Sequence, residues 1–273
     1  MRKESLLQNY FKDTFSFMHK KRQNVLFGAV DSLMDGANLA LSSLGRNFKG
    51  KAKERHQICK MDRLLGNKHL HREIRTIYKA INKLTMVSSL SVICVDWSCL
   101  SYADGVYLLR ASIKIHCRSL VCYQEVHPKE HENNEIAHNL FLDNLKMTVA
   151  GKIVQYYAYR MQIEEEFRDT KSTRFGFGLS DSRTKIHARI NVLLIINMLA
   201  SIYCWVIACS AIKKKKHVDY HANSSKKFNV LSAIKLGKRI YKKIKNFSIY
   251  HFRVAFSYWI KLINGDLLYG EIL

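Results

Sequence analysis

Proline and acidic residues are both scarce in this chain of 273 residues. Pro128 is the sole proline, so little in the sequence would interrupt long helices. Asp and Glu together number 22 against 45 Lys and Arg, which gives a formal net charge of +23. A chain this basic predicts an anionic partner, because each neutralised phosphate releases a counterion. Nucleic acid is the first candidate and an anionic membrane surface is the second.

Cysteine pairs of the CxxC type are also missing. Six of the seven cysteines lie in pairs five residues apart: Cys94/Cys99, Cys117/Cys122 and Cys204/Cys209. That spacing separates the two members on a strand or a helix, which argues against a zinc site. The segment Met1 to Lys21 lacks the apolar stretch of a signal peptide. We therefore expect reduced thiols in a cytoplasmic protein.

The apolar content is sufficient for a folded protein, since hydrophobic residues make up 48% of the chain. We expect one large or two smaller domains. The first 85 or so residues predict helices, from apolar residues at helical spacing such as Leu6, Leu7, Tyr10 and Phe11.

A helix-turn-helix pattern lies within this helical region. Asp62 is predicted to cap a short turn, and Gly66-Asn67 separates it from a second helix. Several basic side chains there would suit phosphate contacts. They are Arg63, Lys68, His69, His71, Arg72 and Arg75. A solvated basic face on a helical bundle is the alternative.

Residues 87–127 change to a β pattern, in which three alternating or β-branched runs predict three consecutive strands. A turn signal, Tyr102 to Gly105, separates the first two. Asp96 follows the most apolar stretch, at the predicted end of the first strand. A helix is then predicted over Glu135–Met147. Its apolar side would carry Ile136, Leu140, Phe141 and Leu145.

Three strands and a helix, with an acid on the first strand, are how an RNase H-like fold begins. Such a fold continues with alternating strands and helices on the other side of the first strand. Here residues 148–154 offer at most a short strand before a helix at Tyr156–Lys171.

A second long helix is predicted from Arg183 onward. Its centre, Ile190–Ile212, carries no charge and is long enough to span a membrane, and Lys213–Lys216 follows like a positive-inside stop. Polar residues interrupt this stretch and favour a buried core helix instead. They are Asn191, Asn197, Ser201 and Ser210.

The tail at 229–245 predicts an amphipathic helix that docks on the core. Its apolar face would carry Val230, Ile234, Tyr241 and Ile244. Contact with DNA backbone or with a membrane surface is the alternative for its basic residues.

The helix at Tyr156–Lys171 raises a functional question, because four side chains share one ridge. At 100° per residue, Tyr157, Arg160, Glu164 and Lys171 fall within about 60° of one another. Pairing of Arg160 with Glu164 on an exposed helix could account for them. Their spacing, however, resembles the YREK signature of bacterial cut-and-paste insertion-sequence transposases with a DDE active site, and is most like the transposon-ten type.

Further segments resemble the same family and occur in the family's order. They are LGRN at Leu44–Asn47, DRLLGNKHLH at Asp62–His71, VDWS at Val95–Ser98, LLRAS at Leu108–Ser112, RMQIEEEFRD at Arg160–Asp169 and LSDSRT at Leu179–Thr184. The resemblance covers nearly the whole chain. It implies an α/β (α+β) fold, with a truncated RNase H-like core between helical N-terminal and C-terminal regions. The regions would be a helical DNA-binding region at 1–85, an incomplete catalytic core at 86–212 and a basic helical region at 213–273.

The resemblance also implies roles for individual residues. Asp96 and Glu164 match the first Asp and the final Glu, which bind two divalent ions, Mg²⁺ or Mn²⁺. Phosphates of the transposon end would be held by Tyr157, Arg160 and Lys171, with further DNA contacts from Arg63, Lys68, His71 and Arg183. The implied partner is double-stranded DNA at transposon ends, together with a second copy or an intact transposase. No membrane is expected.

One family element has no match. The second Asp should follow a further strand, and a long, largely β insertion should precede the YREK helix. Asp143 lies inside the apolar helix pattern and Asp104 lies in a hairpin turn, so neither replaces it. We infer an internal deletion with its junction at about 145–155.

The deletion predicts two consequences. Two carboxylates fall short of two metal ions in charge and ligand number, so we expect a transposase with little or no cleavage activity. The first strand would also lose a neighbour, and an uncovered edge favours aggregation. The alternatives are a DNA-binding remnant that inhibits intact transposase, and a membrane-associated basic protein.

Overall fold

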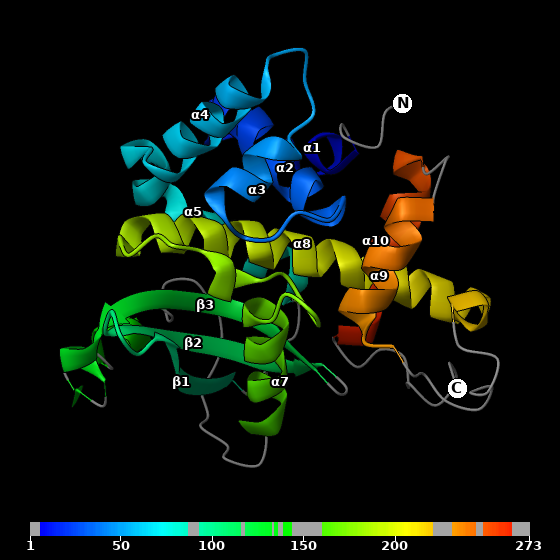
Figure 1. Cartoon of the computed structure of the whole chain (residues 1–273). Coiled ribbons are helices and arrows are strands. Elements are labelled where there is room, and N and C mark those ends of the chain that lie inside the picture. Colours follow the sequence, from blue (N-terminus) through cyan, green and yellow to red (C-terminus); the bar gives the residue numbers. More distant parts are fainter. Residues whose placement is uncertain are drawn as a thin grey trace.

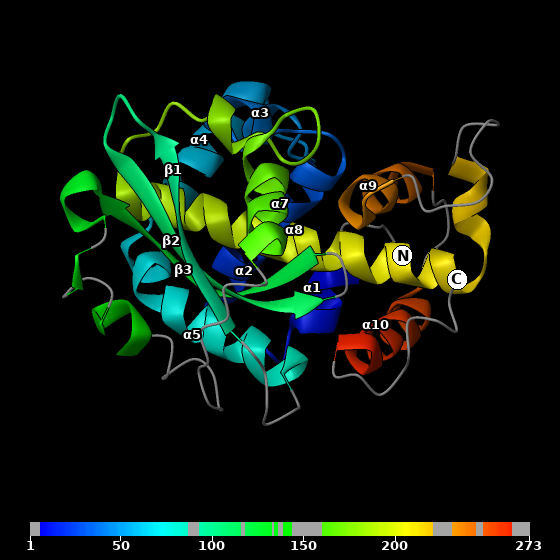
Figure 2. The same cartoon turned by 90° about the horizontal axis from the view of Figure 1, so that it is seen from below.

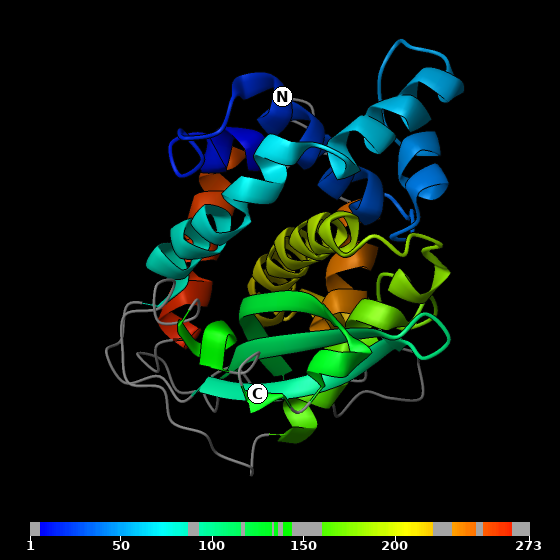
Figure 3. The same ribbon diagram turned by 90° about the vertical axis from the view of Figure 1, so that its left-hand side faces the viewer.

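A long helix, α8 (His187–Lys213), is the element around which the others are arranged (Figure 1). The computed structural model describes residues 6–86, 93–115, 118–132, 134–135, 139–143, 160–220, 231–243 and 248–263. Figure 3 shows α8 between the N-terminal helices and a β-sheet. The fold is mixed α+β and is consistent with the truncated RNase H-like core that we expected.

The N-terminal region is helical, as predicted. Its helices are α1 (Leu6–Phe11), α2 (Lys20–Met34), α3 (Leu41–Arg46), α4 (Glu54–Leu65) and α5 (Lys68–Thr85). The break at Gly66-Asn67 is confirmed, and the Asn67 side chain caps α5 by accepting from the backbone N–H of Leu70 at 2.9 Å. The cap predicted at Asp62 is wrong. Asp62 lies in the last turns of α4, where its carboxylate instead accepts a hydrogen bond from Arg189 at 2.6 Å.

The three predicted strands are confirmed. They are β1 (Ile93–Ser101), β2 (Val106–Ile115) and β3 (Arg118–Pro128), and they form an antiparallel sheet in the order β1-β2-β3. Asp96 does not end its strand, as we had expected, but is the fourth residue of β1. The strand continues because the residues after Asp96 pair with β2 as far as Ser101 and Val106. Among the described strands, β1 is therefore at an edge of the sheet.

The register decides which side chains face which helix. Asp96 lies opposite Arg110, and Arg110 lies opposite Gln124, so the three side chains share one face of the sheet. Helix α7 (Arg160–Lys171) packs on this face, where it contacts β1 and β3. The next residue, Tyr123, points the other way, and its ring meets that of Tyr78 in α5 at 5.3 Å. Helices α7 and α5 thus cover opposite faces (Figure 1).

The helix predicted over Glu135–Met147 is described only at residues 135 and 139–143, and these are helical. Phe141 is buried and its ring lies 5.3 Å from that of Tyr123. Leu140, which we placed on the same apolar side, is instead 58% exposed. Ile136 and Leu145 lie outside the described residues.

Helix α8 is a buried core helix, as predicted. By length and composition it could cross a membrane, but 94% of its most apolar window is covered by the protein. It is apolar all round, which is typical of a helix surrounded by other elements. It begins at His187 and not at Arg183, which lies in the loop after the short 3₁₀ helix η4 (Leu179–Asp181).

The C-terminal helices α9 (Ala233–Lys243) and α10 (Ile249–Ile263) flank the second half of α8 (Figure 2). Short 3₁₀ helices at Lys129–His131 (η2) and Lys216–Tyr220 (η5) follow β3 and α8. The amphipathic α9 docks on the core through Ile234 and Tyr241, as expected, while Val230 and Ile244 lie outside the described residues. A side chain at Gly237 would meet the Cys204 backbone at 2.5 Å, so glycine permits the close packing of α9 on α8.

Candidate functional site

The last residue of α7 ties this helix to β1. The Nζ atom of Lys171 donates to the hydroxyl oxygen of Ser98 at 2.6 Å and to the carbonyl oxygen of Cys99 at 2.7 Å. Lys171 is half-buried, and burial lowers the pKa of its amine. Segments 73 residues apart, the VDWS stretch and the predicted YREK helix, are thereby brought together.

The two predicted catalytic carboxylates lie on these same elements. Asp96 projects from β1 on the face that α7 covers, and its Oδ1 accepts a hydrogen bond from the backbone N–H of Trp97 at 3.0 Å. Glu164 is exposed on α7, seven residues before Lys171 and hence about two turns away on the same side. Both carboxylates also take part in other interactions.

Part of the predicted ridge cannot be placed. Tyr157 and the proposed deletion junction at 145–155 lie outside the described residues, and Arg160 is described only as the first residue of α7. The site is therefore built from Asp96, Glu164 and Lys171.

A buried polar network holds α7 to the sheet, and the sequence did not reveal it. Arg110 is fully buried, and its guanidinium forms an ion pair with Glu166 of α7. Its other N–H groups donate to the Gln124 side-chain oxygen at 2.8 Å and to the Thr170 hydroxyl at 3.1 Å. Burial lowers the pKa of Arg110, while the charge of Glu166 opposes that shift. The Asn197 amide of α8 also donates to the Thr170 hydroxyl at 3.2 Å, so the network joins β2, β3, α7 and α8.

One feature of β2 could have indicated a buried ion pair. Arg110 occupies an inward position of a strand that alternates, between Leu108 and Ser112, which are both buried. A cation at such a position needs a buried anion, because an unpaired buried charge is costly. The sequence did not indicate which acid it would be.

The described residues do not fit a two-metal centre. None of their His, Cys, Asp and Glu side chains forms a group of three or more that could hold a metal ion. Asp104 pairs with Lys185 at 2.5 Å, and this contact, with a hydrogen bond from Ser101, holds the pKa of Asp104 below its usual value. Asp143 is exposed on the segment 139–143. Neither carboxylate supplements Asp96 and Glu164.

A pocket of about 410 Å³ brings two of the predicted DNA-binding residues together. Lys171 lines it from the end of α7, and Arg183 lines it from the loop before α8. Lys185 adds a third cation, beside Asp104 of the β1–β2 turn. The pocket is open to solvent next to β1, so it can receive an anionic group.

The remaining predicted DNA contacts lie on the N-terminal helices. Arg63 on α4 and Lys68 on α5 are exposed and do not line this pocket. The ring Nε2 of His71 lies 2.7 Å from the carbonyl oxygen of Leu65, so this side chain links α5 to the end of α4. The structure therefore does not gather these three residues with Lys171.

Comparison with known protein families gives a match. Residues 55–202, just over half of the chain, match the family described as the transposase DDE domain. The matched range includes the sheet, α7 and the first part of α8. No curated protein and no solved structure matches.

Proposed function

The chain belongs to the DDE transposase family, and on that premise we propose that it binds the ends of an insertion sequence but has lost most or all cleavage activity. DDE transposases bind DNA and use divalent metal ions. The net charge of +23 suits a polyanionic partner. We further propose that the protein acts in the cytoplasm and is of the YREK, transposon-ten-like type.

One observation carries the binding half of this proposal. Lys171 and Arg183 are contributed by separate segments, yet both line one pocket beside β1. These cations converge at Leu100 and Ser101, the end of the strand that bears Asp96, and would hold a DNA phosphate there. In this proposal Tyr157 and Arg160 hold neighbouring phosphates, and Arg63, Lys68 and His71 contact the flanking duplex.

The proposed loss of cleavage rests on the number of carboxylates available to bind metal ions. Asp96 and Glu164 supply two carboxylates, whereas a pair of Mg²⁺ or Mn²⁺ ions calls for more oxygen ligands and more negative charge. Asp104 is paired with Lys185 and Asp143 is exposed, so neither supplies a third carboxylate. We attribute the shortage to an internal deletion near 145–155.

A chain that binds ends without cutting them would compete with intact copies of the transposase. This second candidate function, inhibition by a DNA-binding remnant, follows from the same combination of a cationic pocket and an incomplete acidic site. It would require either shared DNA ends or a heteromer with an intact transposase. The membrane alternative is not favoured, because α8, the apolar helix long enough to span among the described residues, is covered by protein.

The test uses purified full-length protein and DNA from the ends that flank its own gene. Binding and strand cleavage are measured in the same samples, with Mg²⁺ and then Mn²⁺, against duplexes of scrambled sequence. End-specific binding without cleavage supports the proposal. Binding that shows no preference for the ends contradicts it.

Variants decide whether any residual cleavage comes from this site. Cleavage that is lost in Asp96→Ala or Glu164→Gln, but kept in the exposed-carboxylate control Asp143→Asn, would show that the site is active. The proposed defect would then be wrong. Cleavage that is equal in all variants would remove Asp96 and Glu164 from the site.

A further inference from the structure

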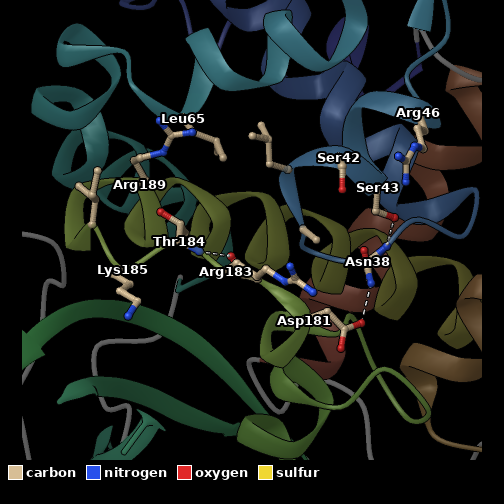
Figure 4. Close-up of a pocket in the computed structure, with 14 residues that line it drawn as sticks. Asn38, Ser42, Ser43, Arg46, Leu65, Asp181, Arg183, Thr184, Lys185 and Arg189 are labelled. Carbon is tan, nitrogen blue, oxygen red and sulfur yellow. Dashed lines mark hydrogen bonds between the residues drawn. The ribbon is translucent and has the colours of Figure 1, made fainter. Parts of the chain in front are cut away.

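A second basic pocket lies between the N-terminal helices and the loop before α8 (Figure 4). Its volume is about 820 Å³, which is in the range of ligand-binding sites, about 300–1,000 Å³. Arg46 lines it from α3, Arg183 and Lys185 from the loop, and Arg189 from the first turn of α8. These cations come from segments that are more than 130 residues apart in the sequence.

This pocket shares part of its lining with the one that contains Lys171. The segment from Ser182 to Lys185 lines both pockets, so an elongated ligand could pass from one to the other. A DNA strand has this shape, and it presents a phosphate at each nucleotide.

The charges in the pocket favour an anion. The one acidic residue that lines it, Asp181, accepts hydrogen bonds from the neutral side chains of Asn38 at 2.5 Å and Thr173 at 2.8 Å. Arg183 is exposed and has no hydrogen bond or ion pair within the part of the chain that the structure describes. In Figure 4 its side chain extends into the pocket.

The other cations have partners that a phosphate can replace. Arg46 pairs with Glu54 at 3.1 Å, with both side chains about 60% exposed, and such surface pairs contribute little to stability. Arg189 uses one Nη atom on Asp62, but its Nε atom is buried without an acceptor among the described residues. A buried donor without a partner is unfavourable unless a ligand supplies the acceptor.

We propose that this pocket binds the phosphodiester backbone of DNA, through Arg46, Arg183 and Arg189, beside the strand held at Lys171. The inference rests on the proposed function, and it adds the N-terminal helix α3 to the DNA-binding surface. The LGRN and LSDSRT segments would then act together, since Arg46 belongs to the first and Arg183 to the second.

The test measures the affinity of full-length protein for a duplex of its own end sequence at several salt concentrations. Arg46→Gln is expected to weaken binding roughly fivefold or more and to reduce the salt slope by about 1. Glu54→Gln, which frees Arg46, is expected to tighten binding, and this gain should vanish when Arg46 is already Gln. The matched control is Arg253→Gln on α10, an exposed Arg outside the pocket, which should change affinity by less than about twofold.

The outcomes separate this inference from the proposed function. Wild-type protein that does not bind the ends contradicts the proposed function. End binding that Arg46→Gln and Arg253→Gln weaken equally, or that neither weakens, overturns the pocket and leaves the proposed function standing. A pocket for free phosphate would lose binding of inorganic phosphate in Arg46→Gln with DNA affinity unchanged, and this result also overturns the inference.

Discussion

The Nζ atom of Lys171 lies 2.6 Å from the hydroxyl oxygen of Ser98. The lysine that the YREK pattern assigns to DNA thus also anchors the helix that carries Glu164. Its amine has two acceptors on β1, and it lines the pocket that we propose for phosphate. Loss of this side chain should affect both the stability of the fold and DNA affinity.

Lys171→Met is expected to lower the free energy of unfolding by roughly 1–2 kcal/mol, because hydrogen bonds from a charged donor are lost. Urea denaturation followed by circular dichroism would measure this. Ser98→Ala should lower the free energy of unfolding by less. In the double variant the two losses should be less than additive, since both substitutions remove the same contact, between Lys171 Nζ and the Ser98 hydroxyl. Additive losses, or a loss no larger than that of the exposed control Lys12→Met, would contradict an anchoring role.

Arg110→Met should be among the most destabilising substitutions in the chain. It breaks the buried ion pair with Glu166 by removing the guanidinium, and breaking a buried pair in this way costs roughly 3–5 kcal/mol. The matched control is Arg168→Met on the same helix, whose pair with Glu165 is at the surface and should contribute less than about 1 kcal/mol.

Removal of both buried charges tests whether the ion pair or the packing around it determines stability. The double variant Arg110→Met, Glu166→Met should be more stable than Arg110→Met alone, because the buried carboxylate is removed together with the guanidinium. A double variant as unstable as the single one would mean that packing, and not the ion pair, decides stability here.

Gly237→Ala should destabilise the protein by disturbing the packing of α9 on α8. The added methyl group would lie 2.5 Å from Cys204 backbone atoms, and overpacking of this kind costs roughly 1–3 kcal/mol. Gly66→Ala is the matched control, since its Cβ would meet its nearest neighbour at 3.5 Å and its φ is −88°. In thermal unfolding, Gly237→Ala should lower the melting temperature and Gly66→Ala should not. An equal change in melting temperature for both variants would contradict the close packing of α9 on α8.

Stability should fall in mild acid because of His127. Burial, with the nearby His131 and His187, lowers the pKa of His127 to about 4. The Glu125 carboxylate, 3.7 Å from Nε2 of His127, opposes this shift, but burial dominates. The folded state therefore favours the neutral ring, so its contribution is complete above the unfolded pKa near 6.5 and is lost as the pH falls toward 4.

The measurement compares wild type with His127→Gln by urea denaturation between pH 7 and pH 4. The difference in unfolding free energy should shift against the wild type by roughly 3 kcal/mol over this range. The exposed His69→Gln serves as the control for loss of a surface histidine. A constant difference for His127→Gln would mean that the ring titrates normally.

Local sequence patterns predicted the helices and strands of this fold well, but they did not predict which residues contact one another across it. Alternation gave the three strands, yet the end of β1 depends on how far β2 pairs with it, so Asp96 was placed at the wrong point of the strand. Helical spacing put Leu140 beside Phe141, whereas only Phe141 is covered by the sheet.

The candidate site was predictable in its residue types and only partly in its geometry. The spacing of Glu164 and Lys171 follows from the helix itself. The buried pair of Arg110 with Glu166 spans 56 residues, and no local pattern fixes a contact over that separation. The pocket shared by Lys171 and Arg183 depends likewise on how the loop before α8 packs against the β1–β2 turn.

Helix α8 packs against α2, α4 and α5, against β3, and against α9 and α10. Every major part of the described chain therefore shares a surface with one helix. A fragment that stopped before α9 would leave an apolar flank of α8 open to water, and one that lacked the first helices would do the same on the opposite flank. The regions that appear distinct in the sequence should melt together as one cooperative unit, so shortened versions of this protein should fail as folded molecules before they fail as DNA-binding ones.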